Sequence, residues 1–444
     1  MRSSRWPVLV ALSLGFGVVQ LDVTAVNVAV NRIGASIGGD IQAMQWVVSA
    51  YTVTFAALIL SAGAGGDRLG AKRVFIAGFI LFTAASAACA AAPSIGVLIA
   101  ARALQGVGAA VLVPCSLALL HHAYPEPARR AWAVGWWAAG ASIALAAGPL
   151  LGGVLIAVAG WRSIFFINLP LGAVAIALTL RFVTETPRHP ARGLDLPGQL
   201  TGMLALGLLA AATIEAGAVG LAPLVLAGFG ASAVCGGAFV TIEARTRTPM
   251  LPLAFFRQGA FAAASAIGLL INICIYGLIF VFSLVLQRHD GLSPLQAGLA
   301  FLPMTLAVGL ANVIAGRLSQ KRTARALIVV GLATMALACA VLWTGTAHGP
   351  VVGLALVLVV LGAGAGVVVP VVTAAMMGSV DRRHSGVAAA TLNSMRQTGS
   401  VLGVALFGAL IAGPGSLLSG TKLALAISIA ALVMAGAAAA RVRA

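Results

Sequence analysis

The chain has 444 residues, of which 61% are hydrophobic and only 8% are charged. Soluble domains carry about 25% charged residues, so this composition excludes a soluble globular protein. The formal net charge of +17 is spread along the chain in groups of a few residues. Because no long basic run is present, we expect no nucleic-acid partner.

Long apolar runs follow one another along the whole chain, separated by short polar gaps. A helix needs about 20 apolar residues to cross the hydrocarbon core of a bilayer. By this measure the sequence predicts an all-α membrane protein with fourteen transmembrane helices. The expected spans are 7–30, 45–65, 74–92, 96–121, 131–158, 163–182, 198–217, 221–242, 260–287, 293–316, 325–345, 350–377, 385–413 and 421–440.

The basic residues predict the orientation of these spans. Of the 27 Lys and Arg residues, 21 fall in the gaps and tails on the side of the N-terminus, and 4 fall in the gaps on the other side. Membrane proteins keep their positive residues on the cytoplasmic side. We therefore expect a multi-pass protein of a bacterial inner membrane, with both termini in the cytoplasm and its basic side attracted to anionic membrane lipids.

The two longest polar stretches, 184–197 and 243–258, flank the seventh and eighth spans. This spacing predicts an N-terminal half of six helices over 1–183, loops and two linking helices over 184–258, and a C-terminal half of six helices over 259–444. Two six-helix halves that face each other are typical of transporters, whose binding site lies near the midplane between the halves.

Two ionisable residues lie at similar depth within the predicted first half. At 1.5 Å per residue, Asp22 lies about 8 Å from the outer end of the first span and Arg102 about 9 Å into the fourth. Intramembrane charges are costly and mark functional sites. Pairing would relieve both desolvation costs, and protonation of Asp22 would release Arg102. The alternative is a static structural ion pair.

Polar residues also form a stripe on the first span. Gln20, Thr24, Asn27 and Asn31 are spaced by four, three and four residues, which places them on one helix face roughly opposite Asp22. The stripe is expected to line an aqueous path while Asp22 faces neighbouring helices. Alternatively, the stripe only holds helices together.

Arg396 lies near the midplane of the thirteenth span. The predicted spans 9–14 contain no Asp or Glu to neutralise it. A guanidinium at this depth must find carbonyls, amides, water or an anionic ligand, which makes Arg396 a candidate binding residue.

A glycine-rich turn with charged residues joins the second and third spans. We expect Asp67 to accept hydrogen bonds from the first amides of the third span, where the helix dipole favours an anion. The basic residues would hold the turn at the lipid surface, so that the segment acts as a latch between helices. Its residues are Gly63, Asp67, Arg68, Gly70, Lys72 and Arg73.

Small residues recur at every fourth position of the fifth span. They form a smooth ridge for close helix packing, and Pro149 within the ridge can kink the helix. The ridge consists of Gly140, Ala144, Gly148 and Gly152.

Together, these motifs resemble those of the major facilitator superfamily, specifically its fourteen-span drug:proton antiporters, over the whole chain. The segments that carry the resemblance are 21–29 (LDVTAVNVA), 46–51 (WVVSAY), 63–73, 102–108 (RALQGVG), 140–153 and 161–170 (WRSIFFINLP). The chain departs from the family pattern at 30–31, at Gly65 and at Ala71. It also lacks the carboxylate that relatives exporting dications carry in helix 10.

The resemblance implies the major facilitator fold and a proton-coupled exporter of drugs or antibiotics that works by alternating access. Asp22 would carry the proton, and Arg102 and Gln105 would tune it. We expect a lipophilic small-molecule substrate, no cofactor or metal besides the proton gradient, and a monomer. The expected substrate contacts are Asn27, Trp46, Tyr51, Trp136, Trp137, Asn272, Tyr276, Asn393, Arg396 and Gln397.

Two other functions remain open. The chain could export a single metabolite or antibiotic from its producer, because the cavity residues do not separate narrow from broad specificity. It could also be a membrane sensor that transports nothing. An enzyme is not expected, because the gaps contain no nucleotide-binding loop, metal-ligand cluster or nucleophile–base pair.

Overall fold

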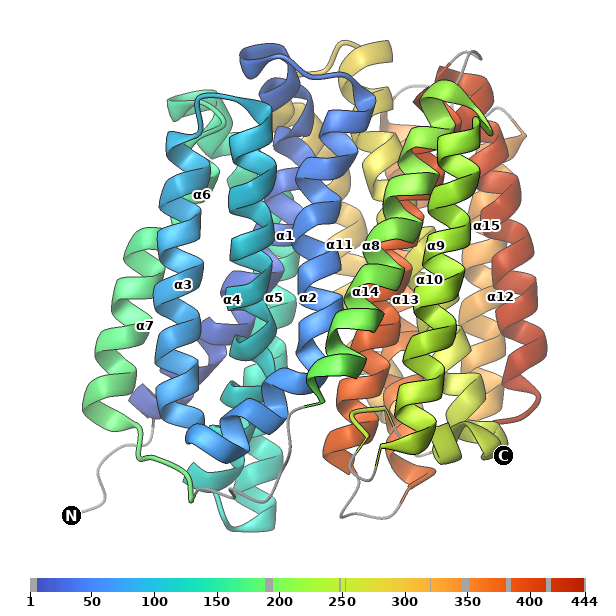
Figure 1. Ribbon diagram of the computed structural model, residues 1–444. Helices are drawn as coiled ribbons and strands as arrows, with labels where there is room; N and C mark the ends of the chain where they lie inside the picture. The colour runs from blue at the N-terminus through green and yellow to red at the C-terminus, as the bar shows by residue number, and fades with distance from the viewer. Residues whose placement is uncertain are drawn as a thin grey trace.

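The computed structural model describes residues 6–187, 195–246, 249–251, 253–319, 321–344, 351–380, 385–412 and 417–442. These segments form a bundle of long helices that run roughly side by side (Figure 1). The helices are α1 (Trp6–Ile37), α2 (Ile41–Leu69), α3 (Ala71–Ala91), α4 (Ile95–Ala123), α5 (Pro127–Ala159), α6 (Ser163–Phe166), α7 (Asn168–Phe182), α8 (Leu196–Val219), α9 (Pro223–Arg245), η1 (Leu253–Arg257), α10 (Gly259–Leu284), η2 (Val285–His289), α11 (Pro294–Leu318), α12 (Ala324–Trp343), α13 (Val351–Gly378), α14 (Ser385–Ala412) and α15 (Leu417–Ala439).

The fourteen predicted spans correspond to these helices. In the described residues, 13 helices are long and apolar enough to cross a membrane, and α2 is the fourteenth if its two segments count as one span. The segments of α2 meet at an angle of 57° between Ile59 and Ser61. The first helix runs seven residues beyond its predicted end, because α1 continues past the apolar run to Gly38, whose φ of 74° ends it.

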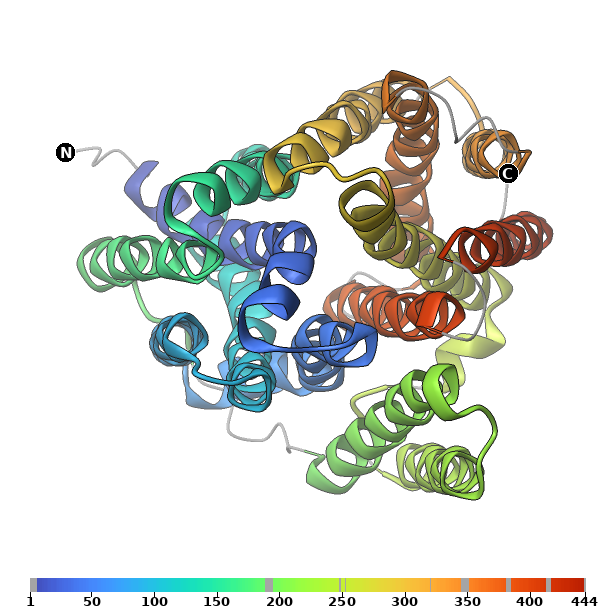
Figure 2. The same cartoon turned by 90° about the horizontal axis from the view of Figure 1, so that it is seen from above.

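The helices separate into two groups with a helix pair at their edge. Seen from above, α1–α7 lie on one side and α10–α15 on the other, with α8 and α9 outside them (Figure 2). Gln199 on α8 donates to the Ala57 carbonyl of α2, and Ser232 on α9 donates to the Ala205 carbonyl of α8. The arrangement of the helices in two groups and a pair matches the predicted order of six, two and six spans. The exact domain boundaries stay a prediction.

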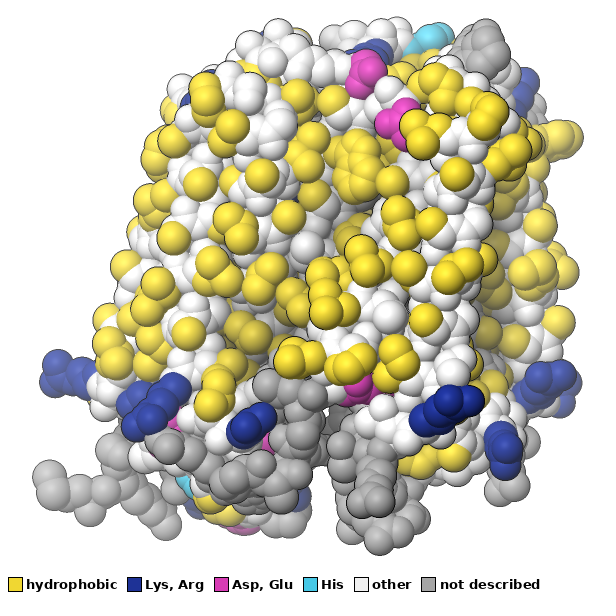
Figure 3. Space-filling model, viewed as in Figure 1, with side chains coloured by type: hydrophobic (Ala, Val, Ile, Leu, Met, Phe, Trp, Pro, Cys, Tyr) yellow, Lys and Arg dark blue, Asp and Glu magenta, His cyan; other side chains and the backbone are white. Residues whose placement is uncertain are grey.

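Both termini lie at the same end of the bundle (Figure 1). We name this end, which holds the start of α1 and the end of α15, the terminal face, and the end that holds the α1–α2 connection at 38–40 the opposite face. Lys and Arg side chains gather near the terminal face, and hydrophobic side chains cover the middle of the bundle (Figure 3). This distribution is the one that a membrane-spanning bundle requires.

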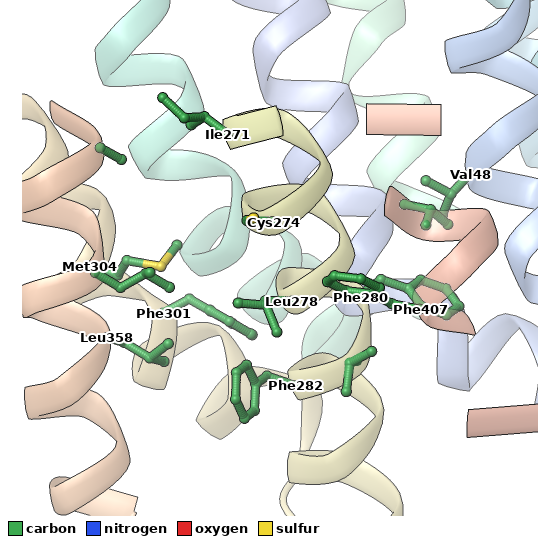
Figure 4. Close-up of a cluster of buried hydrophobic side chains, with 14 of the residues drawn as sticks. Val48, Ile271, Cys274, Leu278, Phe280, Phe282, Phe301, Met304, Leu358 and Phe407 are labelled. Carbon is green, nitrogen blue, oxygen red and sulfur yellow. The ribbon is translucent and has the colours of Figure 1, made fainter. Parts of the chain in front are cut away.

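One hydrophobic core runs through the C-terminal half and takes in residues of the N-terminal half near the opposite face. The N-terminal half enters this core with residues from 26–48, 89–101 and 156–165, which lie toward that face. Phe280 of α10, Phe407 of α14 and Val48 of α2 belong to this cluster, with the two phenylalanine side chains drawn next to each other (Figure 4). The other large core consists of α1–α7 residues, and one C-terminal-half side chain, Tyr276, packs against it.

Polar contacts between the halves follow the same distribution. Gln45 of α2 donates to the Val404 and Ala405 carbonyls of α14 at 3.2 and 2.9 Å. At the same level, Arg288 donates from Nε to the Asn31 side chain at 2.8 Å. The halves are therefore packed together toward the opposite face.

The small-residue ridge of α5 contributes to this packing. A Cβ at Gly148 would lie 1.8 Å from the Thr24 hydroxyl of α1, and a Cβ at Gly152 would lie 3.2 Å from the Ala25 carbonyl. On the other side of α5, the Pro149 carbonyl would lie 2.2 Å from a Cβ at Gly298 of α11. The ridge thus lets α5 approach α1 closely, and Gly298 lets α11 of the other half approach α5.

Candidate functional site

Asp22 and Arg102 meet inside the N-terminal half. Each residue is about 1% exposed, and Arg102 donates from Nη1 to Asp22 Oδ2 at 2.5 Å. The guanidinium also donates from Nε to the Val47 carbonyl of α2 at 3.0 Å and lies 4.4 Å from the centre of the Tyr51 ring. A buried ion pair needs such additional partners, because attraction between the two charges does not by itself offset their desolvation.

Three further polar side chains surround the Asp22 carboxylate. Gln105 donates to Asp22 Oδ1 at 2.8 Å and accepts from Arg102 at 2.6 Å, so it bridges acid and base. Asn168 of α7 donates to the same Oδ1 at 3.2 Å. The Ser86 hydroxyl of α3 accepts from Gln105 and Asn168 at 2.9 and 3.3 Å. Helices α1, α3, α4 and α7 therefore each contribute one or more residues to a single buried network.

Sequence reasoning assigned no role to Ser86 and used Asn168 only as part of a motif. The signal for both was the presence of a polar side chain within an apolar span. Many spans contain such residues, and only the packing of α3 and α7 against α1 shows that these two meet the carboxylate.

The polar stripe of α1 faces a small pocket on the other side of the helix from Asp22. The pocket lies between α1, α5, α10 and α11, so both halves line it. Within it, the Asn27 amide donates to its own helix at Val23, and the Asn27 Oδ1 atom has no hydrogen-bond partner. The lining residues are Thr24, Asn27, Val28, Pro149, Ile279, Phe301, Met304 and Thr305.

Arg396 is held by α13. Its Nη2 atom donates to the Val369 carbonyl at 3.0 Å and to the Thr373 hydroxyl at 2.8 Å, while its buried Nε atom has no partner. The Tyr276 hydroxyl of α10 lies within electrostatic range of this guanidinium. The guanidinium thus has a carbonyl partner, as expected at this depth, and in addition a hydroxyl partner.

Three other predicted substrate contacts lie on the two helices that carry Tyr276 and Arg396. Asn272 is on α10, and Asn393 and Gln397 are on α14. Asn272 is buried and donates to the Gly268 carbonyl of its own helix at 2.8 Å. Asn393 and Gln397 are partly exposed and precede and follow Arg396 on α14. Asn272, Asn393 and Gln397 therefore lie in the region of Arg396. Their contact with a substrate stays a prediction.

The predicted aromatic contacts do not share one place. Tyr51 is fully buried beneath Arg102, and Trp46 is partly exposed on α2. Trp137 is stacked on Phe16 at 4.5 Å and donates to the Ser116 hydroxyl at 3.1 Å, inside the N-terminal half.

Trp136 lies at the surface of the bundle. Its side chain is 50% exposed near the start of α5, with Trp6 and Trp132 at ring distances of 5.9 and 6.4 Å. Exposed tryptophans near the end of a membrane bundle are typical of the interface between lipid and water. Neither Trp136 nor Trp137 lines the pocket of Thr24 and Asn27, and contact of either residue with a substrate stays a prediction.

The prediction that Asp67 accepts from the first amides of the third span is wrong. The amides of Lys72 and Arg73, at the start of α3, donate to the carboxylate of Glu185 at 2.8 and 3.2 Å. The Ala71 amide donates to the Thr186 hydroxyl at 3.0 Å. The segment that follows α7 therefore takes the place that was expected for Asp67, because tertiary packing brings a carboxylate that is distant in sequence to the helix dipole.

Gly70 is needed at this junction for two reasons. Its φ of 99° is disfavoured for residues with a side chain, and a Cβ would lie 2.7 Å from the Glu185 carboxyl carbon. Lys72 extends this contact, since it donates from Nζ to the Leu180 carbonyl at 3.1 Å. The latch thus joins the α2–α3 turn to the end of α7.

We expect Glu185→Ala to lower the free energy of unfolding by about 1 kcal/mol, the usual effect of losing a helix N-cap. The substitution leaves the Lys72 and Arg73 amides without their acceptor. Thermal unfolding of the detergent-purified protein measures the change. Glu126→Ala is the matched control, because the Glu126–Arg129 pair is about 60% exposed and should contribute little. Equal losses in both variants would contradict this prediction.

Known proteins resemble this chain in sequence and in fold. The family profile of the Major Facilitator Superfamily matches residues 12–404 and 265–443. A methylenomycin A resistance protein of Bacillus subtilis is 38% identical over 91% of this chain and 87% of its own length. The multidrug resistance protein Stp of Mycobacterium tuberculosis is 37% identical over 93% and 77%.

A more distant relative, the tetracenomycin C resistance and export protein of Streptomyces glaucescens, is 31% identical over 93% of this chain and 77% of its own. Among solved structures, a D-xylose–proton symporter aligns with a TM-score of 0.70 at 13% identity, covering 98% of this chain and 97% of its own. That likeness shows the fold alone. The chain is therefore a multi-pass membrane transporter rather than an enzyme, and it belongs to the major facilitator superfamily.

Proposed function

We propose that the protein exports drugs or antibiotics across a bacterial inner membrane in exchange for protons. The observation that carries this proposal is the buried network in which Arg102, Gln105 and Asn168 hold the Asp22 carboxylate. The names of the relatives, which include antibiotic resistance and export proteins, support a drug or antibiotic as the cargo.

Asp22 is the proton carrier in this proposal. Protonation removes the negative charge that holds Arg102 Nη1, while Arg102 keeps its Val47 carbonyl and the Tyr51 ring. The attraction between α1 and α4 then weakens, because a neutral carboxyl group attracts a guanidinium far less than a carboxylate does. Since Asp22 belongs to α1, the change reaches the helix that also lines the pocket.

The pocket residues connect the proton site to the other half of the transporter. Thr24 and Asn27 follow Asp22 on α1 and face α10 and α11 across the pocket. The Asn27 carbonyl accepts from Ser283 of α10 at 2.6 Å. A shift of α1 on protonation therefore acts on the contacts between the halves, which is the requirement for alternating access.

The orientation supports export. If the terminal face is cytoplasmic, as the distribution of 21 and 4 basic residues indicates, the shared core near the opposite face closes the protein to the outside. In this state a lipophilic substrate enters from the cytoplasm. Opening of the opposite face then releases it.

Substrate-dependent proton movement in inverted membrane vesicles tests the proposal. With an imposed proton gradient, a transported drug should dissipate the gradient, and a fluorescent pH indicator should report proton release from the vesicles. Vesicles without the protein are the control. Drug accumulation without proton movement would contradict the antiport mechanism. The absence of both across lipophilic cations, neutral drugs and anions would contradict broad drug export.

A further inference from the structure

The interior of the protein carries an uncompensated positive charge. Asp22 is neutralised by Arg102 within 2.5 Å and is enclosed by Gln105 and Asn168. Beyond residue 259 the sequence contains only two acids, Asp290, which directly follows η2, and Asp381, which lies outside the described residues. Helices α10–α15 therefore hold Arg396 without a carboxylate in any of them.

The surroundings of Arg396 leave the hydrogen-bonding capacity of its guanidinium incompletely satisfied. Its Nη2 atom has neutral acceptors, the Val369 carbonyl and the Thr373 hydroxyl, and its Nε atom has none. Both Arg396 and Tyr276 keep some accessible surface. Neutral acceptors orient a guanidinium without cancelling its charge.

Tyr276 places this charge at the boundary between the halves. It belongs to α10, but it packs against the core of the N-terminal half as well as against its own. It also lies within electrostatic range of Tyr51, which in turn covers Arg102. A ligand beside Arg396 and Tyr276 would therefore lie between the two halves, where alternating access moves it from one side of the membrane to the other.

We infer that the exported substrate is a lipophilic anion, bound through a carboxylate or similar acidic group at Arg396. This inference rests on the proposed function and specifies the substrate class for that site. An anion neutralises the guanidinium in a medium of low dielectric constant, where such pairing is strong. A lipophilic cation would be repelled by Arg396, and the carboxylate at mid-depth, Asp22, already has Arg102 as its partner.

Fluorescein and rhodamine 123 provide a test, because the two dyes share a xanthene scaffold but carry opposite charges. Inverted vesicles with an imposed proton gradient are incubated with either dye, filtered and lysed at a fixed pH for quantification. We expect fluorescein to accumulate and rhodamine 123 to remain near the level of empty vesicles. Arg396→Gln should reduce fluorescein accumulation at least tenfold, and Arg396→Lys should restore part of it. Arg317→Gln, at an exposed position of α11, should leave it unchanged.

Ligand-induced thermal stabilisation of the detergent-purified protein gives a second readout that does not depend on transport. A panel of aromatic carboxylates should raise the unfolding temperature of the wild type more than their methyl esters do, and this difference should vanish in Arg396→Gln. Equal stabilisation by acids and esters would overturn the inference. So would rhodamine 123 transport that equals or exceeds fluorescein transport.

The two proposals fail in distinguishable ways. If cations are exchanged for protons, the anion inference fails while the proposed antiport stands. If fluorescein accumulates equally with and without a proton gradient, the anion inference stands while proton coupling fails.

Discussion

Replacing Asp22 by asparagine should abolish proton-coupled export while the protein still inserts into the membrane. Asparagine keeps the shape of the side chain and can still accept from Gln105 or Asn168, but it cannot bind and release a proton at this site. Substrate-dependent proton release from inverted vesicles should therefore fall to the level of vesicles without the protein. Asp40→Asn is the matched control, because Asp40 caps α2 at an exposed connection and asparagine also caps helices.

The effect of Asp22→Asn on protein stability can be separated from its effect on proton coupling. Asp22→Asn leaves Arg102 buried without a counterion, and breaking a buried ion pair costs about 3–5 kcal/mol. The double variant Asp22→Asn/Arg102→Gln removes the unpaired charge, so it should regain part of the lost thermal stability without regaining proton coupling. Full proton coupling in Asp22→Asn would exclude Asp22 as the proton carrier.

Gly298→Ala should prevent the two halves from closing at the opposite face. A Cβ at Gly298 would lie 2.2 Å from the Pro149 carbonyl oxygen and 3.0 Å from its carbon, so α11 and α5 must separate. Backbone atoms cannot move aside as a flexible side chain can, and overpacking of this kind typically costs about 1–3 kcal/mol. Because closure at this face is half of the transport cycle, we expect export to be lost while expression is retained.

Cysteine labelling measures this closure. In a variant without its five native cysteines, Val28→Cys places a thiol in the pocket, where Val28 is 1% exposed. A membrane-impermeant maleimide added to intact cells should label this thiol several-fold faster when Gly298→Ala is present. Gly309→Ala is the matched control on the same helix, since no atom lies within 4 Å of a Cβ there. Unchanged labelling and export in Gly298→Ala would show that close packing at this point is not required.

The sequence determined the number of spans, their order and the residues that bear charge within them. Each of these follows from local composition, because an apolar run long enough to cross a bilayer forms a helix whatever its neighbours are. The cost of an intramembrane charge likewise singled out Asp22, Arg102 and Arg396 before their surroundings were known. Even so, α1 extends seven residues beyond its apolar run, because the helix is ended by the turn residue Gly38 and not by a loss of hydrophobicity.

The tertiary structure decided which of these residues meet. Asn168 reaches Asp22 across 146 positions of sequence, and Glu185 reaches the Lys72 amide across 113. Such contacts depend on the rotation of each helix about its axis and on its neighbours, which composition does not specify. For the same reason, Asp67 was expected in the place that Glu185 occupies, and the half-exposed position of Trp136 beside Trp6 could not be read from composition. The end at which the two halves are closed was also decided by packing, because glycines such as Gly298 permit close approach but only the partner backbone of Pro149 shows where it occurs.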